Sequence, residues 1–101
     1  MSIQSYAEDD GRKQIIKIQG RFNFSMHLEF RDAYSNVTGG GTTFVLDFSE
    51  VTYLDSAALG MLLLLREHAE KNGGKVEITR VNDDVKRVLI IANFDSLFTI
   101  N

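Results

Sequence analysis

The sequence contains no cysteine, no proline and no tryptophan among its 101 residues. Without cysteine the chain cannot form a disulfide, bind zinc through thiolates or use a thiol nucleophile. A long hydrophobic run is also missing, because the longest fully apolar stretch, Met61 to Leu65, is far shorter than the roughly 20 residues of a membrane-spanning helix. The first residues, Met1 to Ser5, have neither the basic flank nor the apolar run of a signal peptide. We therefore expect a cytoplasmic protein.

An excess of positive charge is lacking as well. Eleven Lys and Arg residues stand against fourteen Asp and Glu residues, which gives a net charge of −3. Because nucleic acids and anionic membranes attract basic surfaces, neither is expected as a partner. The hydrophobic content of 44% and the charged content of 25% are typical of a globular protein. A chain of this length supports one core, so we expect a single domain over residues 1–101.

Hydrophobic patterning predicts strands that alternate with helices. The expected strands cover residues 3–8, 15–18, 43–48, 75–81 and 97–100, and the expected helices begin near residues 23–25, 56 and 82–84. Asp9-Asp10-Gly11 has the composition of a hairpin turn between the first two strands. The order β-β-α-β-α-β-α-β predicts an α/β fold with a mixed sheet and helices packed on it. The side chains expected to face the core from the first and third helices are Leu28, Phe30, Ala33, Val37, Val85, Val88, Leu89 and Ala92, with Tyr34 at the edge.

The central feature is the segment that joins the apolar strand around Asp47 to the most apolar helix. A short turn is expected after this strand, in which Tyr53 and Leu54 are buried, and the pair Asp55-Ser56 then precedes the helix. Unpaired backbone N–H groups and the positive end of the helix dipole meet at such a position, which therefore accommodates a phosphate. Ser56 is consequently either a helix cap or a residue that accepts a phosphate.

The helix after Ser56 has two different faces when it is wound at 3.6 residues per turn. The residues on one face, which we assign to the core, are Ala58, Met61, Leu62, Leu65 and Ala69, and those on the polar face are Arg66, Glu67 and Glu70. Leu59 and Leu63 fall on the polar side, with Gly60 nearby. Either another element covers these leucines or they form a contact surface for a partner.

The segment from Phe44 to Ser56, continued by Leu59-Gly60, resembles the STAS domain of bacterial anti-sigma factor antagonists. In that family a strand carrying an aspartate is followed by an Asp-Ser pair and by a helix that opens with Leu-Gly. The similarity extends to residues 20–22, 81–89 and 93–98, which resemble the turn into the first helix, a later capped helix and the closing segment of the family.

This resemblance implies a partner-switching protein of transcription regulation rather than an enzyme. Ser56 would be phosphorylated by an anti-sigma factor that is also a serine kinase, and a PP2C-like phosphatase would remove the phosphate. The unmodified form would bind the anti-sigma factor, and the free protein would be a monomer without a cofactor. The residues expected to contact the partner are Asn23, Asp55, Ser56, Ala57, Leu59, Gly60 and Leu63.

Two departures from the family pattern limit what the resemblance transfers. Many members have Ser or Thr followed by Gly after the phosphorylated serine, whereas this chain has Ala57-Ala58. An acidic residue is common where Asn23 stands. A related alternative is a STAS subunit of another complex, such as a lipid-transport ATPase or a biofilm regulator, in which Ser56 is only a cap.

Two readings outside this family are weaker. A receiver-like phosphoacceptor would use Asp47 with Asp9-Asp10 as magnesium ligands, but that acidic pair reads as a hairpin turn. Asp47 with Asp55 could hold a metal, but no third ligand is suggested.

A hydrolase is the third alternative. Ser56, His27 and His68 are the possible parts of a catalytic triad, but the G-x-S-x-G elbow is missing. His68 would lie about 18 Å from Ser56 along a helix axis, which is too far for a general base. His27 is expected on the surface.

Overall fold

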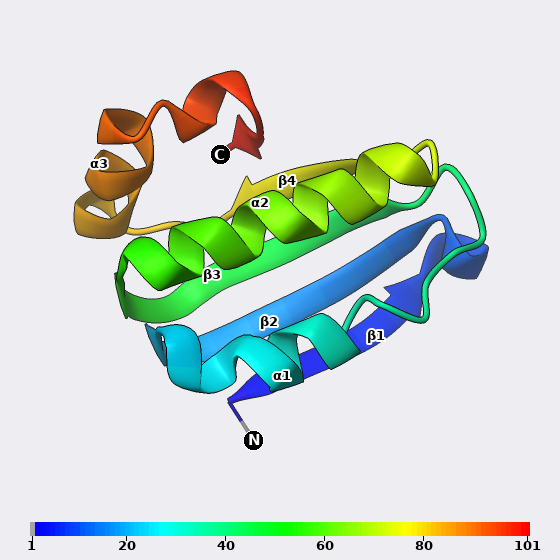
Figure 1. Ribbon diagram of the computed structural model, residues 1–101, viewed down its shortest axis with the longest axis horizontal. Helices are drawn as coiled ribbons and strands as arrows, with labels where there is room; N and C mark the ends of the chain where they lie inside the picture. The colour runs from blue at the N-terminus through cyan, green and yellow to red at the C-terminus, as the bar shows by residue number, and fades with distance from the viewer. Residues whose placement is uncertain (1) are drawn as a thin grey trace.

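The computed structural model of the protein describes residues 2–101, which form a five-stranded sheet with the order β1-β2-β3-β4-β5 (Figure 1). The first pair of strands is antiparallel and all other pairs are parallel. The predicted mixed sheet is therefore confirmed. The strands are β1 (Ile3–Glu8), β2 (Lys13–Phe22), β3 (Thr43–Leu54), β4 (Lys75–Thr79) and β5 (Thr99–Ile100). Met1, which belongs to the domain expected over residues 1–101, lies outside the described residues.

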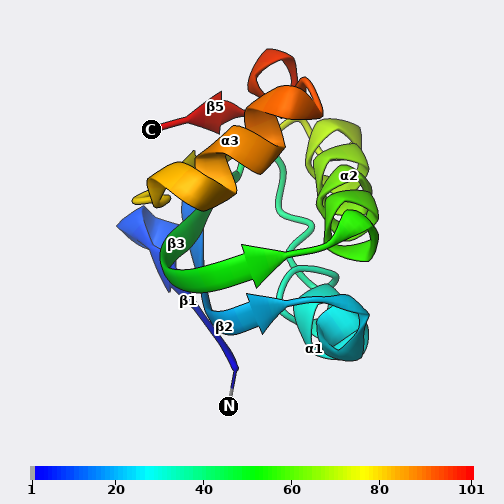
Figure 2. The same cartoon turned by 90° about the vertical axis from the view of Figure 1, so that its left-hand side faces the viewer.

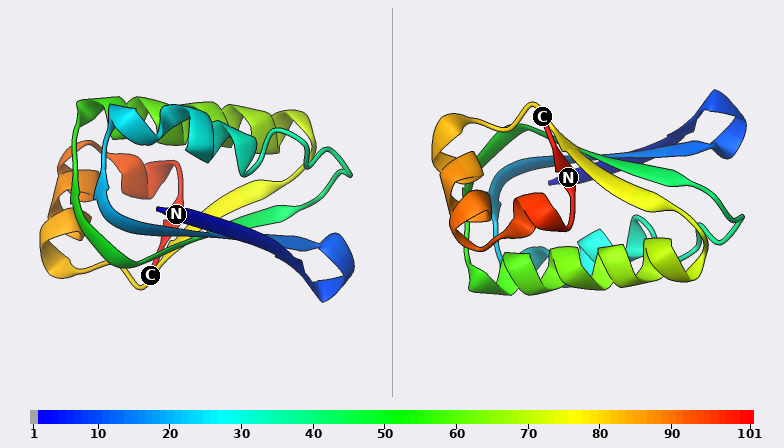
Figure 3. Two further views of the ribbon diagram at one scale, coloured as in Figure 1. Left: turned by 90° about the horizontal axis from the view of Figure 1, so that it is seen from below. Right: turned by 90° about the horizontal axis from the view of Figure 1, so that it is seen from above.

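Two helices lie side by side on one face of the sheet, and a third lies beyond the ends of the strands (Figures 1 and 2). The helices are α1 (His27–Asp32), α2 (Ser56–Lys71) and α3 (Asp83–Ile91), with single 3₁₀ turns η1 (Asp9–Gly11), η2 (Phe24–Met26) and η3 (Phe94–Ser96). Within residues 2–101 no helix covers the opposite face of the sheet (Figure 3).

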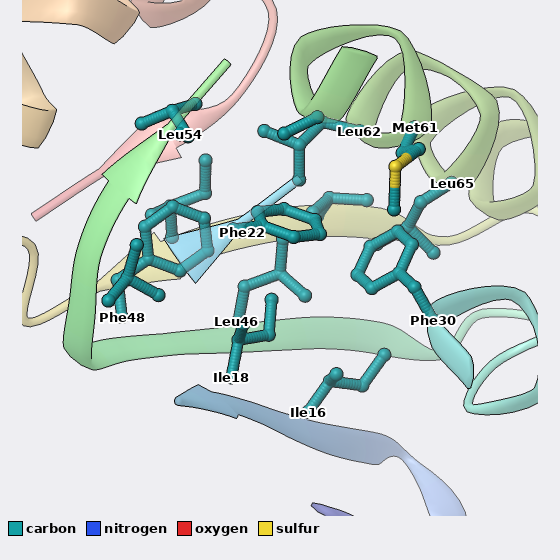
Figure 4. Packing of buried hydrophobic residues seen from close by; sticks show 14 of the residues in the cluster. Ile16, Ile18, Phe22, Phe30, Leu46, Phe48, Leu54, Met61, Leu62 and Leu65 are labelled. Atoms are coloured by element: carbon teal, nitrogen blue, oxygen red, sulfur yellow. The ribbon is translucent and has the colours of Figure 1, made fainter. Parts of the chain in front are cut away.

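The core lies between the sheet and the α1–α2 layer. Phe22 is at its centre, with ring centroids 5.1 Å from Phe30 and 6.1 Å from Phe48 (Figure 4). Aromatic pairs at such distances add about 0.5–1.5 kcal/mol beyond the burial of their area. The five residues of α2 that the winding assigned to the core are all buried, so that assignment is confirmed.

The strand β3 is longer than predicted, because the expected turn after residue 48 is strand up to Leu54. Its pairing with β2 shifts register twice, and each shift leaves one extra residue on β3. These two bulges bend the strand and place every third residue inward, so that Phe48, Val51 and Leu54 are buried. The bulges therefore hide the alternation of period two by which a strand is recognised. Tyr53, expected to be a buried turn residue, is exposed.

The first helix is shorter than its apolar pattern suggested. It ends at Asp32 and continues as turns, so the helical spacing does not apply to the whole segment. Leu28, predicted to face the core, is exposed, because at about 100° per residue it lies on the opposite side of α1 from the buried Phe30. Tyr34, predicted at the edge of the apolar stripe, is buried. In α3, Val88 is exposed although Val85 and Leu89 are buried as expected.

The last two strands are also shorter than predicted. β4 ends at Thr79, because Arg80 adopts a left-handed backbone with φ of +59° and cannot continue the strand. β5 consists of Thr99 and Ile100 alone, after the turns that follow η3.

Asp47 lies on the sheet face that no helix covers, and it is 4% exposed. Its carboxylate accepts hydrogen bonds from the Ser49 N–H at 2.9 Å and from Arg80 Nη2 at 2.6 Å. Burial by itself raises the pKa of Asp47, but the bonds from Ser49 and the charge of Arg80 outweigh it and lower the pKa below its ordinary value of 3.8. The charged carboxylate therefore stabilises the folded state.

We expect Asp47→Asn to lower the free energy of unfolding by about 1–3 kcal/mol at pH 7, because the charge-assisted bond to Arg80 is lost. In wild type, the contribution of the Asp47 carboxylate to the free energy of unfolding is complete when the pH is above 3.8, the ordinary pKa. The contribution disappears as the pH falls through the lower pKa of the folded state. Urea unfolding from pH 7 to pH 2 should therefore show the two proteins converging in acid. Glu50→Gln, which removes the more exposed ion pair with Lys17, should change stability much less. Equal stability of Asp47→Asn and wild type at pH 7 would contradict this account.

Candidate functional site

The site is set by the edge at which β2 and β3 end together. These strands are parallel and remain paired as far as Phe22 and Leu54, so the next residues, Asn23 and Asp55, emerge at the same edge (Figure 2). Asn82 belongs to this edge too, because its Nδ2 donates a hydrogen bond of 2.9 Å to the Val51 carbonyl in β3. Each of these three residues begins a helical segment.

All three residues cap the segments that they begin. Asp55 Oδ1 accepts from the Ala58 N–H at 2.9 Å, and Asn82 Oδ1 accepts from the Val85 N–H at 2.8 Å. Asn23 Oδ1 accepts from the Ser25 N–H at 3.0 Å in η2. Side-chain acceptors of this kind satisfy donors that the first helical turn leaves unpaired. The positive ends of the dipoles of α2 and α3 are thus stabilised at one edge.

Ser56 is the first residue of α2 and is exposed. The cap of α2 is Asp55, and within residues 2–101 the Ser56 hydroxyl makes no hydrogen bond. The question of which residue caps the helix is therefore answered in favour of the aspartate. The serine hydroxyl is left available to solvent next to the N-terminal N–H groups of a sixteen-residue helix.

The structure gathers most of the predicted contact residues around Ser56. Gly60 is exposed, Ala57 is half-buried, and the Leu63 side chain is 42% exposed on the outward side of α2. Leu59 differs from Leu63, because it is half-buried and packs against the core. The two leucines that sequence left ambiguous thus have different environments: Leu63 is accessible, and Leu59 is partly covered.

Other exposed residues near this edge were not selected from the sequence. Phe24 follows Asn23, and Leu64 follows Leu63, and both side chains are exposed. The winding of α2 could have identified Leu64, because it also falls outside the core face. The guanidinium of Arg21 lies 4.3 Å from the centre of the Tyr53 ring. That pair depends on the shifted register of β2 and β3, which the sequence does not reveal.

The two histidines take part in other contacts. His68 Nε2 lies 2.9 Å from the Val37 carbonyl oxygen, and its ring packs near Tyr34 and Phe44. His27 is half-buried and stacks on Phe24. The geometry therefore does not bring either ring to Ser56 as a general base.

Among residues 2–101 no group of three or more His, Cys, Asp or Glu side chains is placed to hold a metal ion. Asp47 instead pairs with Arg80 on the sheet face without helices, and Asp55 caps α2. Within the same residues, no helix is both long and apolar enough to cross a membrane.

The mixed sheet, the capped helices at one edge and the exposed serine define the class of the protein. Residues 6–99 match the family model described as "Mlab, STAS domain", and the chain belongs to the STAS domain family. The resemblance seen in the sequence is thereby confirmed. A STAS-domain containing protein of Pseudomonas aeruginosa strain UCBPP-PA14 is 44% identical over 101 residues, which are 100% of both chains.

Solved structures with the same fold include anti-sigma factor antagonists, which are regulatory proteins. A candidate antagonist from Thermotoga maritima has a TM-score of 0.80 and 21% identity, over 97% of this chain and 84% of that chain. SpoIIAA of Bacillus in its unphosphorylated form has a TM-score of 0.73 and 13% identity, over 98% and 86% of the two chains. Its phosphorylated form has a TM-score of 0.71 and 17% identity, over 98% and 90%. At these identities the likeness establishes the fold.

The capping geometry predicts different effects for two neighbouring substitutions. Asp55→Ala should lower the free energy of unfolding by about 1 kcal/mol, because the Ala58 N–H loses its acceptor. Asp55→Asn should recover most of this loss. Ser56→Ala should change stability by less than about 0.5 kcal/mol, since its hydroxyl makes no bond. Chemical unfolding followed by circular dichroism measures all three variants, and an equal loss in Ser56→Ala and Asp55→Ala would assign the serine to the cap.

Proposed function

We propose that the protein is an anti-sigma factor antagonist whose binding to its partner is switched by phosphorylation of Ser56. The observation that carries this proposal is the division of roles at the start of α2. Asp55 caps the helix, and the adjacent serine presents an exposed hydroxyl that the fold does not use. A partner kinase can modify such a hydroxyl without breaking any hydrogen bond of the described chain.

The chemistry of this position suits a reversible switch. A phosphate adds about −1.5 to −2 charges and three strong acceptor oxygens. At a helix N-terminus the unpaired N–H groups and the dipole accommodate that charge. Beside Asp55, and close to the exposed Gly60 and Leu63, the same charge opposes an acidic or apolar partner surface. Phosphorylation would then release the partner while the domain stays folded.

The proposed circuit has two further proteins. An anti-sigma factor with serine kinase activity binds the unmodified form and phosphorylates Ser56, and a PP2C-like phosphatase restores the hydroxyl. All three work in the cytoplasm, and the free antagonist is a monomer. SpoIIAA has solved structures in an unphosphorylated and a phosphorylated form, which supports the view that this fold can hold both states.

A pull-down with wild type, Ser56→Ala and Ser56→Asp, read by mass spectrometry, tests the switch. Wild type and Ser56→Ala should capture the same kinase-like partner, and Ser56→Asp should lose it, because the carboxylate imitates part of the phosphate charge. Ser5→Asp provides the matched control, since Ser5 is also exposed and its hydroxyl makes no hydrogen bond within residues 2–101, but it lies in β1. Thermal unfolding verifies that each variant is folded. Undiminished capture by Ser56→Asp would instead indicate a permanent subunit of another complex.

The exposed face of α2 predicts a second effect on partner binding. Leu63→Ala should weaken the binding of the captured partner by about fivefold to tenfold, because a half-exposed leucine contributes on the order of 1 kcal/mol when it is buried at an interface. Ile91→Ala is the control, since Ile91 is 78% exposed but lies at the end of α3. Isothermal titration calorimetry with the purified partner measures both. A loss in Ile91→Ala without a loss in Leu63→Ala would place the interface on α3.

A further inference from the structure

A groove runs between α1 and α2 on the outer side of the helical layer. Its two adjoining parts have volumes of about 160 and 300 Å³, and both are lined by Arg31, Tyr34 and Leu64. Phe30 and Met61, which face each other across the two helices in Figure 4, form the floor of the first part. The groove is thus a continuous depression along the seam between the helices.

One end of the groove is apolar and accessible. Phe24 and Leu64 line it and are 60% and 59% exposed, respectively. His27 stacks on Phe24 with 4.1 Å between ring centroids and an interplanar angle of 8°, which holds the phenyl ring in place. Two large apolar side chains on opposite sides of a groove are suited to an apolar ridge inserted between them.

The other end of the groove is basic. Arg31 and Lys71 line it, against one carboxylate, that of Glu67. Within residues 2–101 neither cation has a carboxylate at ion-pairing distance. In a chain with a net charge of −3, this end therefore attracts negative charge.

Tyr34 adds a hydrogen-bond donor at the basic end. Its side chain is 6% exposed, and its hydroxyl makes no hydrogen bond among the described residues. Burial raises the pKa of Tyr34, so the hydroxyl keeps its proton near neutral pH. Because the tyrosine lines both parts of the groove, its free donor and the two cations suit a carboxylate ligand.

We propose that this groove binds an amphipathic helix of a partner protein, with apolar residues against Phe24 and Leu64 and acidic residues beside Arg31 and Lys71. Helices bind in grooves of this kind through apolar side chains spaced three and four residues apart. The charge of the basic end selects an acidic helix over a basic one.

The groove is separate from the face that carries Leu63. Leu64 and Met61 lie on the side of α2 that faces α1. Arg66 follows Leu63 by about one turn, and its Nε donates a hydrogen bond of 3.2 Å to the Leu97 carbonyl on the η3 side. Lys71 of the basic end is the last residue of α2, whereas Ser56 is the first. The charge preference of the groove should therefore be independent of the phosphate state of Ser56, and it goes beyond the proposed switch.

Two synthetic peptides of 16 residues test the proposal. Both carry the same leucine stripe at helical spacing, and the last turns carry glutamates in one peptide and lysines in the other. Titration of the ¹⁵N-labelled protein should shift amide resonances in residues 24–34 and 61–71 with the glutamate peptide. Its dissociation constant should be about tenfold lower than that of the lysine peptide, because the two cations of the groove attract the glutamates and repel the lysines.

Charge reversal provides the matching variants. The double substitution Arg31→Glu and Lys71→Glu should weaken the binding of the glutamate peptide about tenfold and strengthen the binding of the lysine peptide. The control reverses Arg12 and Lys13, which are exposed at the β1–β2 hairpin and have no ion-pair partner among residues 2–101. Leu64→Ser should weaken the binding of both peptides, whereas Ile91→Ser should leave the binding of both unchanged.

Several results would overturn the proposal. These are equal affinity for the two peptides, no binding of either at millimolar concentration, and shifts confined to Leu63, Arg66 and Leu97. Ser56→Asp should keep the preference of wild type for the glutamate peptide over the lysine peptide, and a loss of that preference would contradict the independence of the basic end from Ser56. The pull-down tests only the switch at Ser56, and the titration tests only peptide binding in the groove. Either proposal can therefore be contradicted without the other.

Discussion

The parallel pairing of β2 and β3 beyond the bend determines where η2 and α2 begin. Two bulges on β3 let the strand curve while it stays hydrogen-bonded to β2 as far as Leu54. Gly20, with φ of +88°, supplies on β2 a backbone conformation that other residues rarely adopt. Without this extended pairing, Asn23 and Asp55 would not emerge side by side, and the starts of η2 and α2 would not share one edge of the sheet.

At that edge, the cap of α2 and the exposed hydroxyl belong to different residues, Asp55 and Ser56. If Ser56 were itself the cap, a phosphate would have to displace a structural hydrogen bond and would weaken the helix that presents it. Because Asp55 holds the cap and also lies beside the hydroxyl, one carboxylate secures the helix and adds to the negative charge that a phosphate creates. The replacement of the neighbouring hydroxyl residue of the family by Ala57 leaves this arrangement intact, since Ala57 takes no part in the cap.

The sequence was most informative where one physical pattern operated alone. The helical period of α2 identified its buried residues, because a single long helix packs on a single sheet. Prediction failed where the assumed side-chain pattern did not hold. The bulges of β3 placed Tyr53 outside, and Leu28 lies on the opposite side of α1 from the buried Phe30. The Asp47–Arg80 pair and the groove could not be predicted either. Both join side chains from segments whose relative placement follows from the register and the helix packing, and no local spacing encodes it.

The three sides of α2 explain how one helix can both fill the core and contribute to the two proposed binding surfaces. Its inward side, including Leu62 and Leu65, is committed to the core. Leu63 is on its outward side near Ser56, and Leu64 is on the side toward α1. A helix turns by about 100° per residue, so consecutive leucines reach different surfaces. The run of four leucines from residue 62 to residue 65 looks like one hydrophobic block, but its members lie in three places: the core, the face near Ser56 and the groove.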